Sequence, residues 1–146
     1  MKKLFAFALI ALTTPSAFAT GGFWCEYDRD GLKFEVNGVT TRSFEGAIVD
    51  LTAAIAGEMG DDGYVMKVDE KFVKTDVRQY WNLDSEFKLL LYKEVEDTNS
   101  IFSSTRVVLE TKTSDDVDFQ GTISIEHHGK NGSWSIEKAP IACGQE

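Results

Sequence analysis

The sequence predicts an all-β fold: a single antiparallel meander of eight or nine strands that closes into a small barrel or a barrel-like sandwich. Three observations support this prediction. Apolar and polar residues alternate in segment after segment, β-branched and aromatic residues are concentrated in those segments, and Gly, Asp and Asn separate them. A barrel is favoured over an open sandwich because two cysteines near the chain ends can tie the first and last strands together.

The composition fits one folded domain that does not bind nucleic acid. The chain has 146 residues, of which 42% are hydrophobic and 12% aromatic, enough for one packed core. It carries 24 Asp and Glu against 15 Lys and Arg, a formal charge of -9. A charge of this sign repels phosphate groups, so we expect no nucleic-acid partner.

The start of the chain has the three parts of a secretory signal peptide in order. Met1–Lys3 is basic, Leu4–Leu12 is unbroken apolar sequence, and Ala17–Ala19 is a small-residue cleavage site. We therefore expect a signal peptide at 1–19, a single all-β domain at 20–146, and a periplasmic or secreted location. The apolar run is shorter than the roughly 20 residues that span a bilayer, so we expect no membrane insertion. Cleavage of the signal peptide would remove two lysines and no acidic residue. The mature chain would then have 15 − 2 = 13 basic residues and a formal charge of 13 − 24 = −11.

The two cysteines are expected to form a disulfide. Cys25 lies near the start of the predicted domain and Cys143 near its end, and an exported chain folds in an oxidising compartment. A disulfide requires the two Cα atoms to approach within about 7 Å, so the first and last strands should be neighbours. The alternative is a reactive thiol or a metal-binding pair.

Turn residues divide the domain into short alternating segments. After the first segment, Asp28–Gly31 is a turn signal, and Leu32, Phe34 and Val36 then share one face. Near the end, Phe119–Ile125 alternates in the same way. Pro140 falls outside the segments, as a strand requires. The expected strands are 22–28, 32–36, 64–68, 77–81, 87–93, 105–113, 119–127 and 133–137.

The segment 43–56 fits two structures. Its apolar residues fit a helical stripe with Ser43 as a possible N-cap and Gly57 as a stop. The same stretch also alternates, with Glu45, Ala47, Val49, Leu51, Ala53 and Ile55 on one face. A long strand is favoured because the flanking segments are strands and because Gly46 and Val49 disfavour a helix. With this strand as the third, alternate turns of a simple meander lie at the same end of the barrel.

This parity predicts one acidic rim. The turns at that end carry ten acidic residues against one basic residue, Arg29, whereas the other rim is nearly neutral. Such a rim would attract a cationic protein or Ca²⁺. The alternative is that acidic residues simply favour turns. The expected binding residues are Asp28, Asp30, Asp61, Asp62, Asp115, Asp116 and Asp118.

No motif predicts catalysis, a cofactor or a bound metal. His127 and His128 are adjacent, so on a strand they point to opposite faces and do not easily share a metal ion. Asp28–Gly31 begins like a calcium loop, but Leu32 occupies the fifth position, where a ligand is required. We therefore expect a protein that is not an enzyme. The alternative is an enzyme that uses two rim carboxylates with Ca²⁺.

The aromatic residues allow a second kind of site. They either fill the core or line a cavity for a small apolar ligand, as in ligand-carrying barrels. The residues concerned are Trp24, Trp81, Trp134, Phe34, Phe87, Phe119 and Tyr92.

The layout of the chain resembles that of periplasmic lysozyme inhibitors. The shared features are a signal peptide, a small all-β domain, and a cysteine in the first strand (Cys25) paired with one near the end (Cys143). The Ser-Gly-x-x-Tyr loop of one such family does not occur in this sequence. The resemblance implies a binding protein whose partner is a cationic enzyme. Because no motif predicts catalysis, we expect an exported, non-catalytic binding or interaction module that uses its acidic rim or its barrel interior. A lysozyme-inhibitor-like protein is the alternative that the resemblance implies.

Overall fold

The computed structural model describes residues 20–41, 46–61, 64–83, 85–96, 102–113, 118–130 and 132–145. These residues form nine strands and one short 3-10 turn, η1 (Lys74–Asp76). The strands are β1 (Thr20–Arg29), β2 (Leu32–Thr41), β3 (Ile48–Asp61), β4 (Tyr64–Val73), β5 (Val77–Leu83), β6 (Glu86–Glu96), β7 (Phe102–Thr113), β8 (Asp118–Gly129) and β9 (Gly132–Gln145).

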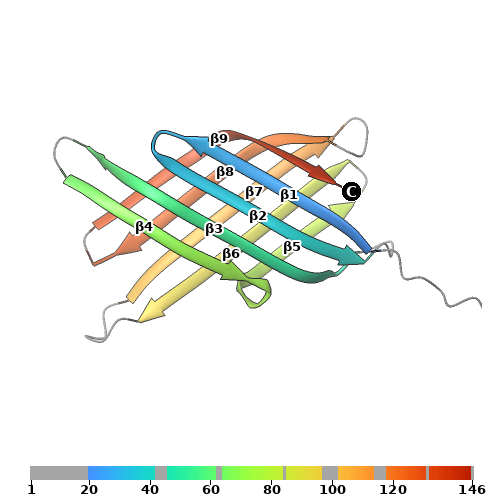
Figure 1. Cartoon of the computed structure of the whole chain (residues 1–146), viewed down its shortest axis with the longest axis horizontal. Coiled ribbons are helices and arrows are strands. Elements are labelled where there is room, and N and C mark those ends of the chain that lie inside the picture. The colour runs from blue at the N-terminus through green and yellow to red at the C-terminus, as the bar shows by residue number, and fades with distance from the viewer. Residues whose placement is uncertain are drawn as a thin grey trace, which may run out of the picture.

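All nine strands belong to one antiparallel sheet that curls into a half-barrel. Its order is β4-β3-β2-β1-β9-β8-β7-β6-β5, so the first and last strands pair at the centre and β4 and β5 form the two edges. Figure 1 shows strands β1–β4 crossing in front of β5–β8. The predicted all-β meander is confirmed, and so is the expected pairing of the first strand with the last.

The strand order places the break in the meander between β4 and β5. In a simple meander the first and ninth strands run in the same direction, but β1 and β9 are antiparallel. One connection must therefore break the alternation, and η1 does so, because it joins two strands that do not pair. As a result β1 and β3 end on the left of Figure 1, whereas β5 and β7 end on the right.

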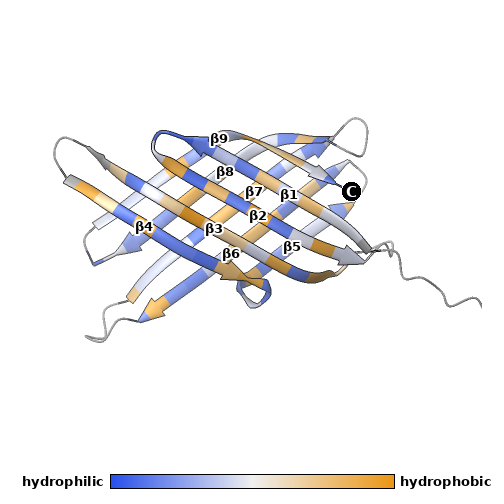
Figure 2. Cartoon of the chain, viewed as in Figure 1, coloured by the Kyte–Doolittle hydropathy of each residue, from blue (hydrophilic) through white to orange (hydrophobic). Residues whose placement is uncertain are grey.

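The interior is filled by the inward faces of both halves. Figure 2 shows apolar and polar positions alternating along the strands. Four aromatic rings cluster in the interior. The Phe87 ring contacts the other three, with its centroid 4.9 Å from that of Phe23, 5.9 Å from that of Tyr80 and 6.0 Å from that of Phe119. Phe23 comes from β1 and Phe87 from β6, so these rings join the two halves of the sheet across the core.

The ambiguous segment is a strand, as favoured, but its alternation changes phase. β3 pairs with β2 and β4, and Leu51, Ala53 and Ile55 are buried. Val49 is 46% exposed although the predicted pattern placed it on the same face as these residues. A β-bulge explains the difference: Val39 lies opposite Asp50 and the next residue lies opposite Ile48, so Val49 is the extra residue.

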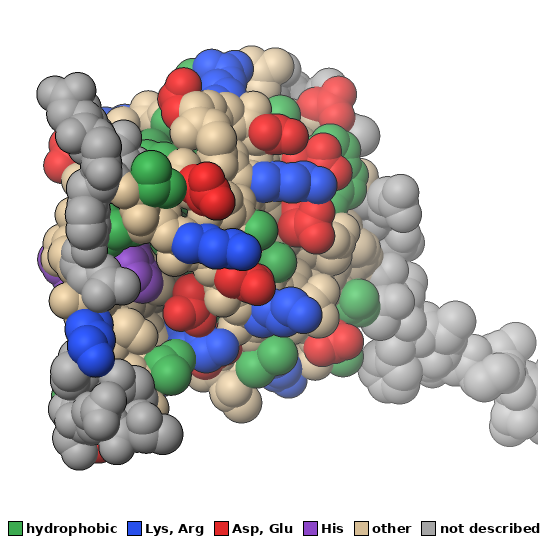
Figure 3. Space-filling view, turned by 60° about the vertical axis from the view of Figure 1, so that its left-hand side comes forward, with side chains coloured by type: hydrophobic (Ala, Val, Ile, Leu, Met, Phe, Trp, Pro, Cys, Tyr) green, Lys and Arg blue, Asp and Glu red, His purple; other side chains and the backbone are tan. Residues whose placement is uncertain are grey.

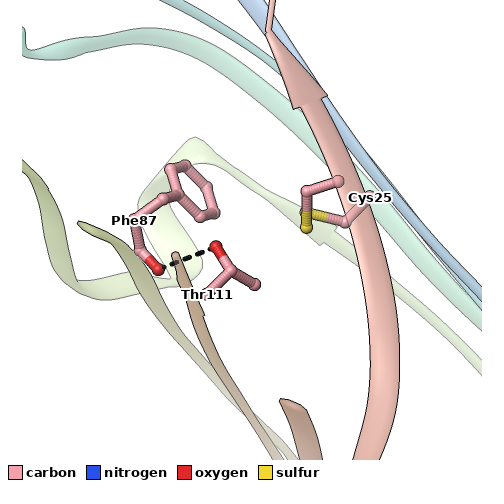
Figure 4. The surroundings of a disulfide bond; sticks show 4 residues. Cys25, Phe87 and Thr111 are labelled. Carbon is pink, nitrogen blue, oxygen red and sulfur yellow. Dashed lines mark hydrogen bonds between the residues drawn. A yellow bond between two sulfur atoms is a disulfide. The ribbon is translucent and has the colours of Figure 1, made fainter. Parts of the chain in front are cut away.

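The predicted disulfide joins Cys25 of β1 to Cys143 of β9, with the Cα atoms 4.0 Å apart. Both cysteines are buried. Figure 4 shows the bond facing the interior, toward Phe87 and Thr111 of the other half. The Thr111 hydroxyl donates to the Phe87 carbonyl oxygen at 3.1 Å, which satisfies a buried polar side chain.

Pro140 lies inside a strand, so the prediction that it falls outside the strands is wrong. It sits in β9 opposite Thr122 of β8. A strand tolerates proline where one of its sides has no partner. β9 meets this condition there, because β1 pairs with β9 only from Ala142 to Gln145.

Candidate functional site

The outer face of the sheet opens where β1 and β9 part. The two strands pair over only four positions, from Phe23 opposite Gln145 to Glu26 opposite Ala142. Beyond this point β1 has only β2 as a neighbour, and β9 has only β8. We call this opening the β1–β9 wedge.

The residue at position 140 explains why the ladder ends. The 4.0 Å Cα spacing of Cys25 and Cys143 is that of a non-hydrogen-bonded antiparallel pair. Hydrogen-bonded pairs alternate with these, so the next one after Glu26 and Ala142 would join Asp28 to Pro140. Proline has no N–H to donate, and the Asp28 carbonyl oxygen loses its expected partner.

A bulge interrupts β9 two residues before Pro140. Lys138 has a positive φ of 49°, and the β8–β9 register shifts between Ile123 and Ile125. The Lys138 N–H donates to the Ser124 hydroxyl at 3.0 Å instead of to a strand carbonyl. The wedge is therefore fixed by two local features of β9.

The wedge contains a hollow of about 590 Å³. Trp24 forms one wall and is 38% exposed. Its indole lies flat over Gly144, where a Cβ atom would be only 2.7 Å away. The other lining residues are Glu26, Tyr27, Asp28, Arg29, Gln120, Gly121, Pro140, Ile141 and Ala142.

Two carboxylates in the hollow have no basic partner. Glu26 and Asp28 are exposed, and neither forms an ion pair with another described residue. Among the described residues that line the hollow, Arg29 is the one cation. Tyr27 lies buried beside them, and burial, aided by the nearby Asp30 charge, raises the pKa of its phenol. The hollow thus joins an aromatic wall to available negative charge, the features that bind a basic side chain.

Two smaller hollows continue across the outer face of β1–β4. One of about 340 Å³ lies on the β2 side of Trp24, and one of about 210 Å³ lies between β2 and β4. Asn37 and Thr52 line both. Trp24 therefore stands between the wedge and a second depression, where a partner could contact it from both sides.

Among the described residues, the acidic residues predicted to share one rim lie toward both ends of the sheet. Asp28, Asp30 and Asp61 lie where β1 and β3 end, whereas Asp118 begins β8 beside Gly144, toward the end where β1 starts. On the face in Figure 3, acidic and basic side chains alternate. The rim prediction assumed strict alternation through all nine strands, which η1 breaks. Asp62, Asp115 and Asp116 lie outside the described residues.

The predicted aromatic set divides among three environments. Phe34, Phe87 and Phe119 are buried in the core. Trp24 and Trp81 are exposed on the outer face. Two others are half-buried: Trp134 packs at the edge of the core, and Tyr92 carries Arg78 above its ring at 5.8 Å.

A polar row crosses the inner face near the end where β6 and β8 finish. Lys93, Thr105, His127 and Trp134 lie opposite one another on four successive strands. We call these four residues the inner polar row. The Lys93 ammonium donates to the Lys71 carbonyl oxygen of edge strand β4 at 2.7 Å. This contact links edge strand β4 to β6, the strand beside the other edge, β5.

His127 is held by its neighbours in this row. Its Nδ1 is 2.9 Å from the Thr105 hydroxyl, and its ring stacks on Trp134 at 5.7 Å. Burial lowers the pKa of the His127 imidazole, partly opposed by the Glu70 carboxylate and reinforced by His128. His128 points to the opposite face, as predicted, and its Nδ1 lies 2.8 Å from the Ser133 hydroxyl.

Acidification is expected to destabilise the protein through His127. The His127 pKa is lower in the folded protein than in the unfolded chain, where histidine binds a proton near pH 6.5. Protonation of His127 therefore favours the unfolded state. The stabilising contribution is present at higher pH and is lost as the pH falls through the unfolded value toward the folded one. His127→Gln should therefore reduce the loss of unfolding free energy between about pH 8 and about pH 5, measured by urea denaturation.

His128→Gln is the matched control for this prediction, because the His128 side chain is exposed. Because His128 only reinforces the lowering of the His127 pKa that burial causes, this variant should reduce the pH dependence less than His127→Gln does. An equal reduction in both variants, or none in His127→Gln, contradicts the role assigned to burial of His127.

Within the described ranges, no group of three His, Cys, Asp or Glu side chains is placed to hold a metal ion. The same part of the chain contains no helix with the length and apolar character needed to cross a membrane.

The sequence interpretation included Asp28 and Trp24 but missed Glu26 and Pro140 as parts of one site. One signal was present: Trp24, Glu26 and Asp28 occupy alternate positions of the first strand and therefore share a face. The role of Pro140 in the site follows from the register between β1 and β9, which the alternation within each strand does not encode.

No known protein family matches the chain, and no curated protein or solved structure matches it either.

Proposed function

We propose that the chain is an exported, non-catalytic binding protein of the periplasm whose partner is a cationic protein, and that it binds through the surface around Trp24. The observation that carries the proposal is the hollow of about 590 Å³ that joins this exposed indole to Glu26 and Asp28. Exposed aromatic anchors beside unpaired charge are typical of binding surfaces.

The location is supported by two independent features. The start of the chain matches a secretory signal in all three of its parts. The Cys25–Cys143 disulfide fits an oxidising extracellular environment. A disulfide also suits a binding protein, because it keeps β1 in place beside the wedge.

The chemistry of the hollow favours a basic side chain. The methylene groups of Lys or Arg can lie along Trp24 and Pro140 while the charged end meets Glu26 or Asp28. The expected mature charge of 13 − 24 = −11 would speed encounter with a positively charged protein. A carrier of apolar ligands receives less support, because Phe34 and Phe87 are packed in the core.

Lysozyme is a suitable cationic probe. We expect it to bind with micromolar or tighter affinity at about 20 mM salt and more weakly at about 300 mM, because salt screens the charges. Trp24→Ala should weaken binding about tenfold or more, as loss of an aromatic anchor does. The double variant Glu26→Gln/Asp28→Asn should weaken it about fivefold at low salt.

Matched controls separate this surface from general attraction between opposite charges. Trp81→Ala removes an exposed tryptophan on β5, and Glu96→Gln/Glu110→Gln removes two acidic charges on β6 and β7. Both should bind within about twofold of wild type. Titration calorimetry measures all four variants. Absence of binding to lysozyme and to other basic proteins at low salt, or an equal loss in the controls, would overturn the proposal.

A further inference from the structure

We infer that the β1–β9 wedge seats an extended, basic polypeptide segment of the partner, which pairs antiparallel with the free edge of β1. The inference rests on the proposed function and specifies how the cationic partner is held.

The wedge presents main-chain groups that no strand of the sheet uses. Alternation of the ladder directs the N–H and C=O of Asp28 toward the position that Pro140 would occupy, beyond the last pair, Glu26 and Ala142. Pro140 offers no donor there. A free strand edge is a template for another extended chain, and proteins use such edges to bind peptides.

The opening is stable because the sheet cannot readily close it. Extending the ladder would require a donor at position 140. Just beyond it, the positive φ of Lys138 and the bulge opposite Ser124 make β9 irregular and unsuited to a continued ladder. The edge of β1 therefore stays available while the disulfide, one pair before the end of the ladder, holds the strand in place.

The side chains beside this edge define the sequence of the segment. Trp24, Glu26 and Asp28 project from the same face of β1 at every second residue, a spacing of roughly 6.5 Å. Side chains of an added antiparallel strand repeat at the same interval on that face. Because Trp24 and Glu26 already face Gly144 and Ala142 of β9, a basic residue of the segment would lie directly opposite Asp28, with Glu26 as its diagonal neighbour.

Charge favours a different protein over a second copy of this chain as the occupant. A second copy carries the same formal charge of -9, and its β1 has the same acidic face. Like charges directly opposite one another on paired strands are destabilising. A segment rich in Lys or Arg has the complementary charge.

Two isomeric peptides test whether the edge of β1 is used. The probe is a capped synthetic octapeptide of alternating Thr and Lys. In an extended chain all lysine N–H groups point to one edge and all threonine N–H groups to the other, because successive residues alternate. In an antiparallel pair, the residue directly opposite Asp28 has its side chain on the same face and donates its N–H to the Asp28 carbonyl oxygen. If the lysines share the face of Asp28, the lysine N–H groups therefore make this bond.

We expect the peptide N-methylated at its lysines to bind at least about fivefold more weakly than the isomer N-methylated at its threonines. The two peptides have equal charge and composition, so electrostatics alone predicts equal binding. Calorimetry at about 20 mM salt measures both. Equal affinities of the two isomers would overturn the inference.

The replacement Pro140→Thr gives a second measurement on the protein itself. It restores an N–H opposite Asp28, so it should extend the ladder, protect the residue-140 amide from hydrogen exchange, and weaken binding of the unmethylated peptide about fivefold or more. A protected residue-140 amide together with undiminished peptide binding would also contradict the inference.

The outcomes distinguish this inference from the proposed function. If lysozyme binds in a manner that depends on Trp24 while the two isomeric peptides bind equally, the strand-pairing inference fails and the proposed function stands. If neither lysozyme nor the peptide binds, both fail.

Discussion

Replacing both Cys25 and Cys143 with Ala is expected to lower the free energy of unfolding by about 5 kcal/mol and the melting temperature by roughly 15–25 °C. The bond closes a loop with a sequence separation of 118 residues, so its loss frees a large part of the unfolded chain. Alanine is the appropriate replacement because both side chains are buried and serine would leave unpaired hydroxyl groups there.

The position of the disulfide adds a native-state reason for this large effect. In the strand ladders of the described residues, only four pairs, from Phe23–Gln145 to Glu26–Ala142, connect the β1–β4 half of the sheet to the β5–β9 half. The chain also connects the two halves through η1, but the strands on either side of η1, β4 and β5, do not pair with each other. Without the covalent bond, the short β1–β9 ladder and the core contacts between Phe23 and Phe87 must hold the halves together beside an opening that is already present.

Urea and thermal denaturation of the double variant measure this effect, with reduced wild-type protein as the comparison. The variant and the reduced protein should be destabilised to a similar extent. A loss smaller than about 1 kcal/mol would show that the β1–β9 ladder and the core hold the halves without the bond.

Phe87→Ala is expected to destabilise the protein by about 3–5 kcal/mol. The Phe87 ring is 2% exposed and contacts Phe23, Tyr80 and Phe119, so its loss leaves a cavity between the two halves of the sheet. Phe87→Leu should cost less, because leucine fills part of the volume. Urea denaturation at neutral pH measures both.

Trp81→Ala is the matched control for Phe87→Ala. It removes a larger aromatic side chain, but Trp81 is 47% exposed on the edge strand β5. Its effect should stay within about 0.5 kcal/mol. Equal losses for the two variants would contradict the assignment of Phe87 to the centre of the core.

Both stability predictions concern the junction that forms the proposed binding surface. The disulfide and Trp24 lie on opposite faces of the same ladder, with Cys25 inward and Trp24 outward. A variant that loosens the ladder should therefore weaken lysozyme binding even though it removes no contact residue. Binding assays on the Phe87 variants separate the two contributions, because Phe87 is buried in β6 and does not line the wedge.

The sequence by itself determined the local structure and the closure of the chain ends. Strands such as β7 and β8 were predictable because the alternation of inward and outward residues is contained within a few neighbouring positions. The segment that became β3 was also assigned correctly as a strand, because Val49 and Gly46 disfavour a helix locally. The cysteines predicted the β1–β9 contact because a covalent bond fixes two distant residues in space.

Only the tertiary structure decided how the strands are arranged relative to one another. The pairing of β1 with β9 requires one break in the alternation, and no local pattern marks η1 as the place for it. Asp28 and Asp118 consequently lie toward different ends of the sheet. The wedge likewise depends on the β1–β9 register, which places Pro140 opposite Asp28, although these residues are more than one hundred positions apart in the chain. Register between such distant segments is set by packing of the whole core, which alternation within a single strand does not specify.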